Sequence, residues 1–208
     1  EGFGEIALSL VDKSSAMVHP AFDLILTQYT RLGEATQKAM YEGLRRYDLA
    51  AQEVLVREEQ FSDQLYFVWK GGLKAYYLKE GREVVEWFAF AGDFVCALAC
   101  FYEGQPSRHS IEATEATQLL AWTKADVSEF CDRFHDFERL GHLSVTQTML
   151  RLQRRLVALQ FENATQKYRN LLAVYPAIEM RLPLQDIASY LGITQETLSR
   201  IRHARGRI

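Results

Sequence analysis

The sequence lacks the features of a membrane-spanning or secreted protein. Its 208 residues contain no apolar run long enough to cross a bilayer and no signal-peptide pattern. Cysteine occurs only at Cys96, Cys100 and Cys131, an odd number without the spacing of a disulfide framework. We therefore expect a cytoplasmic protein with no membrane contact.

The sequence also has few residues of the kinds that a metal site needs. A cupin-type enzyme places two or three His and a Glu inside a β-barrel. Five histidines occur, of which only the second lies among the expected strands: His19, His109, His135, His142 and His203. Cys96 and Cys100 could share a helix face, but buried structural cysteines are favoured over a metal or redox pair. We expect no metal, no cofactor and no catalysis, and a cupin-type enzyme is the remote alternative.

The net charge is only −3, but it is unevenly distributed. From Gly141 to the end, ten Lys or Arg face four Asp or Glu, a balance of +6, whereas the first 140 residues carry −9. A basic C-terminal third on an acidic body suggests a polyanionic partner at one end. The same balance also fits a solvated helical face.

The stretch from Leu182 to Arg205 has the pattern of two short helices around a tight turn. Gly192 suits the left-handed end of the first helix, and Thr194 suits the N-cap of the second. The apolar residues are spaced to share one core: Ile187, Ala188, Leu191, Leu198 and Ile201. This pattern predicts a helix-turn-helix, with an ordinary helical hairpin as the alternative.

The run Thr194-Gln195-Glu196-Thr197-Leu198-Ser199-Arg200 resembles the start of the recognition helix in the Crp/Fnr superfamily of bacterial transcription regulators, (Ser/Thr)-x-Glu-Thr-(Val/Leu)-x-Arg. The similarity continues upstream through most of the chain. Arg200, Gln195 and Glu196 are the base-edge candidates, for guanine, adenine and cytosine amino groups respectively. The phosphate-contact candidates are Thr194, Ser199, Arg202 and Arg205.

Short β-rich runs separated by glycine turns fill the middle of the chain. Strands are expected at residues 54–56, 65–69, 73–78, 84–88, 110–113 and 117–122, with hairpin turns at Gly71-Gly72 and residues 79–82. Phe22 to Leu49 reads as helical, broken at Gly33 and Gly43. Many short strands with glycine turns predict an α+β fold with an antiparallel barrel or jelly roll. The run Leu65–Val68 followed by the glycine pair also resembles the sensory barrels of Crp/Fnr proteins.

Residues 91–110 occupy the position of that family's phosphate-binding cassette. In cyclic-nucleotide binders the cassette reads Gly-Asp-x-x-Gly-Glu and then an Arg, in which Glu holds the ribose and Arg the phosphate. Gly92, Asp93 and Phe94 match, and Arg108 stands near the phosphate Arg, one residue out of ungapped register. These four residues form a candidate ligand site, but Cys96-Ala97 replaces the Gly-Glu pair. Cyclic AMP is therefore disfavoured, and the small-molecule effector is unknown. Arg108 could equally be paired with a carboxylate at the barrel rim.

A long helix is expected from about Phe137 to Gln160. Its seam residues follow at spacings of four, three, four and three: Val145, Met149, Leu152, Leu156 and Leu159. This is the a/d pattern of a coiled coil. Leu143, Leu150 and Val157 line a second face, expected against the barrel. Because one barrel can cover only one stripe, dimerisation is favoured over an intramolecular helix pair.

The expected organisation is a sensory barrel with N-terminal helices (1–136), a dimerisation helix and hinge (137–162) and a winged-helix-like helix-turn-helix domain (163–208). The resemblance implies a homodimeric regulator on double-stranded DNA with a palindromic operator, and leaves RNA polymerase open as a partner. A ligand-sensing protein that acts through protein contacts is the alternative. Phe3-Gly4-Glu5-Ile6-Ala7-Leu8 also resembles the phosphate motif, but it precedes the strands and is interpreted as an N-terminal arm or helix.

Overall fold

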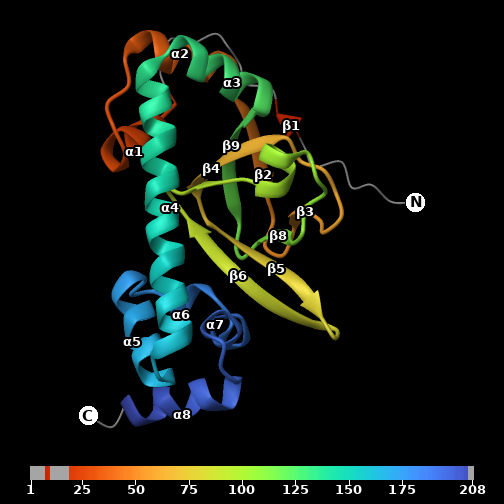
Figure 1. Cartoon of the computed structure of the whole chain (residues 1–208), viewed down its shortest axis with the longest axis vertical. Coiled ribbons are helices and arrows are strands. Elements are labelled where there is room, and N and C mark those ends of the chain that lie inside the picture. The colour runs from red at the N-terminus through yellow and green to blue at the C-terminus, as the bar shows by residue number, and fades with distance from the viewer. Residues whose placement is uncertain (1–7, 10–18, 206–208) are drawn as a thin grey trace. The chain divides into compact units, whose positions relative to one another are not determined.

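The computed structural model describes the backbone of residues 8–9 and 19–205 and the side chains of residues 19–204. The chain forms two compact units (Figure 1). Unit 1 comprises Glu1–Lys74 and Phe88–Thr146, and unit 2 comprises Ala75–Trp87 and Gln147–Ile208. The motif from Phe3 to Leu8 lies outside the described residues except for the backbone of Leu8. The three-part division made from the sequence stays a prediction.

Two sheets form the β-structure. The first has the strand order β1 (Leu8–Ser9), β2 (Arg45–Leu49), β9 (Thr117–Thr123), β4 (Gln64–Lys70), β7 (Phe94–Val95). The second has the order β3 (Val54–Val56), β8 (Ser110–Ala113), β5 (Gly72–Lys79), β6 (Arg82–Phe90). The pairs β1–β2, β2–β9, β4–β9, β4–β7 and β3–β8 are antiparallel. The predicted α+β class with a double-sheet antiparallel barrel is confirmed.

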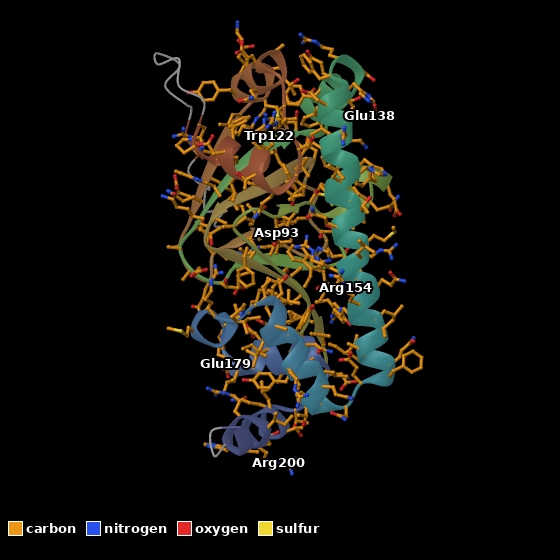
Figure 2. All side chains as sticks on the ribbon, turned by 90° about the vertical axis from the view of Figure 1, so that its left-hand side faces the viewer. Asp93, Trp122, Glu138, Arg154, Glu179 and Arg200 are labelled. Carbon is orange, nitrogen blue, oxygen red and sulfur yellow. The ribbon has the colours of Figure 1, made fainter. Side chains whose placement is uncertain are left out.

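Helices α1 (Ala21–Gln28), α2 (Glu34–Glu42) and α3 (Lys124–Arg133) pack on the first sheet. Phe22, Met40 and Phe67 are fully buried in the shared core with Trp122, whose side chain is labelled in Figure 2. The Trp122 Nε1 donates a 2.7 Å hydrogen bond to the Met40 carbonyl oxygen. This bond satisfies the one polar atom of a ring that is otherwise held by apolar contacts.

The expectation of helix from Phe22 to Leu49 is wrong in its last part. The helix ends at Gly43, and Arg45–Leu49 forms strand β2, paired residue by residue with β9 from Arg45↔Ala121 to Leu49↔Thr117. Tyr47 and Leu49 are buried on alternate positions, which is the strand period. The segment forms a strand because it pairs with β9, about seventy residues further along the chain. Local periodicity in the sequence does not reveal such a distant partner.

The hairpin expected at Gly71-Gly72 is also wrong, although the glycine requirement is real. Strand β4 belongs to the first sheet and β5 to the second, so the chain crosses between sheets at Gly71. Gly71 has φ +85°, and a Cβ there would lie 2.4 Å from Thr117 Oγ1. The crossing therefore needs glycine for both its backbone angle and its close approach.

The second predicted turn is a true hairpin. Strands β5 and β6 are neighbours joined by Glu80 and Gly81, which both have positive φ (53° and 75°). Two positive φ angles in a two-residue loop are typical of a type I′ turn, which matches the twist of the strands that it joins. Residues 75–87 of this hairpin belong to unit 2.

The remaining helices follow the predicted order. The long helix α4 runs over His135–Phe161, and Asn163 caps α5 (Ala164–Val174) with its side chain on the Gln166 N–H. Then come α6 (Ile178–Arg181), α7 (Leu184–Leu191) and α8 (Gln195–Arg205). The expectations for residues 137–160 and 164–174 are confirmed, whereas α3 and α6 were not expected.

Candidate nucleic-acid interface

Helices α7 and α8 form the predicted helix-turn-helix. Gly192 ends α7 in the left-handed conformation with φ 65°, and its N–H bonds back to the Ala188 and Ser189 carbonyls. Thr194 Oγ1 then accepts the Thr197 N–H at 3.2 Å as the N-cap of α8. Pro183 sits at the N-cap of α7, one position before the helix. Both local signals in the turn act as the sequence indicated.

The core of this motif is shared among the helices of unit 2. Helices α5, α7 and α8 contact one another in pairs. The buried residues come from all of these elements and from α6: Tyr168, Leu171, Ile178, Ile187, Ala188, Leu191 and Leu198. Because Leu198 is fully buried, the rotation of α8 about its own axis is fixed. The side chains that α8 presents to solvent are therefore fixed as well.

The exposed face of α8 carries three of the predicted base readers. Gln195, Glu196 and Arg200 are exposed, and Ser199 is half-buried. Arg200 lies on the outer side of the helix (Figure 2), and its Nη2 makes a 3.3 Å hydrogen bond to Thr197 Oγ1. Hydrogen-bond donors and acceptors on the first two turns of such a helix can reach base edges in a major groove.

The electrostatics of α8 favour an ionised carboxylate at its start. The pKa of Glu196 lies below its usual value because its carboxylate accepts hydrogen bonds from its own backbone N–H and from the Thr194 hydroxyl, with the positive charge of Arg200 adding to the effect. A negative charge at a helix N-terminus also interacts favourably with the helix dipole. Glu196 therefore remains an acceptor over the physiological pH range.

The two remaining arginines of the predicted set differ from Arg200. The Arg202 Nε lies 2.5 Å from Glu179 Oε1, so its guanidinium is engaged within unit 2. The side chain of Arg205 lies outside the described residues. The sequence analysis missed Glu179, which stands 23 positions before Arg202 and belongs to no motif.

The residues of the cassette are placed by contacts within unit 1. Gly92 has φ +99°, its N–H donates to the Val68 carbonyl, and its own carbonyl accepts the Tyr29 hydroxyl at 3.0 Å. Asp93 Oδ2 accepts the Phe90 N–H at 2.9 Å. Phe94 packs against Tyr29, Phe67 and Trp122. These three residues therefore build the turn between β6 and β7.

Arg108 is exposed and makes no ion pair with any other described residue, so the carboxylate pair considered at the rim is not formed. The cassette helix is a five-residue π-helix, Ala99–Glu103. Cys100 is buried and its Sγ donates to the Gln60 carbonyl, while burial raises the pKa of the half-buried Cys96 to about 12. A thiol with such a pKa stays protonated and is a poor metal ligand.

The predicted seam of α4 is exposed to solvent in the part of the chain that the structure describes. Its five residues, Val145, Met149, Leu152, Leu156 and Leu159, are between 38% and 62% exposed. Leu150 and Val157 on the second stripe are exposed as well, so this stripe is not covered at these two positions, contrary to expectation. An apolar surface of this length on one helix is typical of a protein interface.

Comparison with known proteins identifies one domain and one relative in sequence. The cyclic nucleotide-binding domain model matches residues 46–134. The nitrogen fixation regulation protein FixK of Bradyrhizobium diazoefficiens is 29% identical over 181 residues, which cover 80% of this chain and 74% of FixK. These matches support a transcription regulator of the Crp/Fnr type.

Solved structures share the fold of this chain. FixK2 of Bradyrhizobium japonicum superposes with a TM-score of 0.66 at 20% identity, over 77% of this chain and 85% of FixK2. The catabolite activator protein of Thermus thermophilus superposes with a TM-score of 0.53 at 18% identity, over 88% of this chain and 87% of that protein. Like these proteins, the chain combines an antiparallel sheet domain with C-terminal helices.

Unit 2 contains a junction that no sequence motif indicated. Ser189 Oγ accepts the Val85 N–H at 2.9 Å and donates to the Glu83 carbonyl at 3.0 Å, which ties α7 to strand β6. Arg155 of α4 donates to the Val85 and Tyr190 carbonyls and stacks over the Tyr190 ring at 4.7 Å. Ser189 and Arg155 lie in no motif, so only the folded chain reveals this junction.

Two further observations concern the described residues of both units. The described residues contain no group of three or more His, Cys, Asp or Glu side chains placed to hold a metal ion. Within the same residues no helix has the length and apolar character needed to cross a membrane. In unit 1 a buried ion pair joins Lys74 of β5 to Glu112 of β8 at 3.5 Å.

Proposed function

We propose that this regulator acts as a homodimer on a palindromic operator, by binding and not by catalysis, and in the cytoplasm. The observation that carries the proposal is the face of α8, where Gln195, Glu196 and Arg200 are exposed around a helix that Leu198 anchors. A two-fold dimer would place two such helices in successive major grooves about 34 Å apart. Contact with RNA polymerase stays a prediction.

The DNA test begins with selection of a preferred duplex from a random pool. Dissociation constants are then measured from about 50 to 200 mM salt for the selected duplex, a scrambled duplex and a duplex with one half-site only. We expect a palindromic preference and a large loss of affinity on the half-site. Equal binding to the selected and scrambled duplexes would remove operator recognition, and no binding to any duplex would favour action through protein contacts.

The exposed seam of α4 supports the dimer. Burying Asp in an apolar helix contact costs several kcal/mol, because the charge loses its hydration without gaining a partner. The double variant Met149→Asp/Leu156→Asp should therefore sediment as a monomer and lose operator binding. A matched control, Gln147→Asp/Gln153→Asp, places the same charges at exposed positions of α4 outside the seam and should remain dimeric. A dimeric seam variant would place the interface elsewhere.

Control by a small-molecule effector is the least supported part of the proposal. The turn at Gly92–Phe94 is present, but Cys96-Ala97 offers no carboxylate for a ribose, and unpaired ribose hydroxyls would cost affinity. The effector would therefore differ from cyclic AMP. Isothermal titration with cyclic AMP should give no tight binding, and a micromolar dissociation constant would contradict this expectation.

A further inference from the structure

The C-terminal half of α8 contains an arginine whose partners lie inside unit 2. Arg202 Nε contacts Glu179 Oε1 of α6 at 2.5 Å, and the Tyr168 hydroxyl of α5 donates to the same oxygen, also at 2.5 Å. Tyr168 is buried, and the Glu179 side chain is 27% exposed. One carboxylate thus joins the recognition helix to two other helices.

The position of Arg202 on α8 explains this contact. Residues 200 and 202 are separated by about 200° around a helix, so Arg202 lies nearly opposite Arg200. It follows the fully buried Leu198 by four positions and therefore lies beside the packed face of α8, with its side chain 40% exposed. The arginines of the recognition helix consequently project from two different sides of it.

We infer that Arg202 is a positioning residue for operator recognition and that the Arg202–Glu179–Tyr168 cluster sets specificity by holding the orientation of α8. This inference rests on the proposed function of α8. A charge-assisted hydrogen bond is stronger than a neutral one, and this one fixes α8 relative to α6 more firmly than apolar contacts alone, which allow a helix to roll. A small roll of α8 would displace Arg200 and Glu196 from the base edges that they read.

The alternative role, a phosphate contact, conflicts with the neighbouring carboxylate. Glu179 neutralises the guanidinium that would attract a phosphate. Moving Arg202 to DNA would take the guanidinium away from the Glu179 carboxylate, which would keep the Tyr168 hydroxyl as its partner among the described residues and would lie near a negatively charged backbone. The two roles therefore predict opposite consequences when Glu179 loses its charge.

The experiment compares Arg202→Ala, Arg202→Lys, Glu179→Gln and Tyr168→Phe in the full chain. Binding to the selected and scrambled duplexes is measured across salt, and thermal melting reports folding. For a positioning role, Arg202→Ala and Glu179→Gln should each weaken operator binding about tenfold, with scrambled binding and the salt slope unchanged. Arg202→Lys should fail to restore operator affinity, because a lysine lacks the planar fork. Tyr168→Phe should lower operator affinity by a smaller factor, since the ion pair remains.

The Glu179→Gln variant is decisive because it removes a negative charge and so makes the net charge of the protein more positive. Non-specific electrostatics would make it bind DNA more tightly, so weaker operator binding opposes that trend. The double variant Arg202→Ala/Glu179→Gln should be no weaker than Arg202→Ala, since both changes remove one contact.

The inference is overturned if Arg202→Ala weakens both duplexes equally and lowers the salt slope by about one unit, as a phosphate contact would. It is also overturned if Glu179→Gln keeps or raises operator affinity. A parent protein that does not distinguish the two duplexes would instead refute operator recognition itself, and this outcome is read before any variant is tested.

Discussion

The cassette turn at residues 91–94 and the recognition helix at residues 194–200 both match a family pattern, but the matching residues are used differently. In the turn, Gly92 and Asp93 bond to backbone and side-chain groups of unit 1. In the helix, Gln195, Glu196 and Arg200 face solvent. A motif combines residues that build a local structure with residues that contact a ligand, and exposure and partners separate the two kinds.

The largest expected effect is a loss of stability of unit 1 in acid, through helix α1, which supports the cassette turn. Tyr29, which bonds to the Gly92 carbonyl, follows α1, and α1 begins after His19, whose Nδ1 accepts the Ala21 N–H. Burial of the ring, with Arg46 and Lys70 adding to it, lowers the pKa of His19 to about 4. In the unfolded chain the His19 imidazole takes up a proton near pH 6.5, whereas in the folded chain it stays neutral until about pH 4. The contribution of the neutral ring to the free energy of unfolding is therefore complete above pH 6.5 and is lost as the pH falls towards 4.

The free energy of unfolding of unit 1 should therefore fall by up to about 3 kcal/mol between pH 6.5 and 4. On the recognition helix the pKa of Glu196 is lowered by hydrogen bonds from its own backbone N–H and the Thr194 hydroxyl, so this carboxylate does not follow the His19 transition. Urea denaturation at several pH values measures the effect, and His19→Asn, which keeps an acceptor for the Ala21 N–H, should flatten the profile. If stability depends on pH in this variant as it does in the parent, the acid sensitivity belongs to a group other than His19.

The next effect tests whether the cassette glycine is structural. Gly92→Ala places a Cβ at φ +99°, and this atom would lie 2.0 Å from Gln28 Oε1. Gln28 is exposed and can move away, so backbone strain dominates, and we expect a loss of about 2 kcal/mol without any ligand present.

Gly104→Ala is the matched control for that substitution. Gly104 also has a positive φ, 66°, but a Cβ there meets nothing within 4 Å. The left-handed region is milder for alanine, and we expect a loss of about 1 kcal/mol. Equal melting temperatures of the two variants would mean that the turn at Gly92 is not specially constrained.

The third effect tests whether the recognition helix contacts DNA bases. Arg200→Ala should weaken operator binding about tenfold and change binding to a scrambled duplex much less, since a bidentate guanine contact discriminates by about 1–3 kcal/mol. Arg133→Ala removes the same charge from an exposed arginine on α3 and should leave operator discrimination intact. If Arg200→Ala lost equal affinity on both duplexes, Arg200 would be a phosphate contact.

The smallest effect concerns Arg108, the cassette residue that the fold does not use. Because Arg108 is exposed, Arg108→Ala should leave the free energy of unfolding within about 0.5 kcal/mol of the parent, with a nearly unchanged melting temperature. A change in operator binding only when a metabolite mixture is added would show that Arg108 contacts an effector. A drop in melting temperature would assign it a structural partner.

The sequence predicted best the features that are decided within a few residues. Gly192 and Thr194 specify their turn through local backbone bonds, and the seam of α4 follows from periodicity alone. Strand β2 was missed because its pairing with β9 is distant in sequence. The contact between Arg202 and Glu179 was missed for the same reason, since the two residues are 23 positions apart and belong to no shared motif.

The β5–β6 hairpin has a consequence for dividing this protein. Its strands start in the second sheet, yet residues 75–87 belong with the helices from Gln147 onward, where Val85 bonds to Ser189 and Arg155. A fragment that contains only the C-terminal helices would therefore lose these partners and leave the Ser189 hydroxyl and the Arg155 guanidinium without them. Chimeras that exchange the DNA reader between family members would have to transfer the hairpin tip with it, so the transferable piece is discontinuous in sequence.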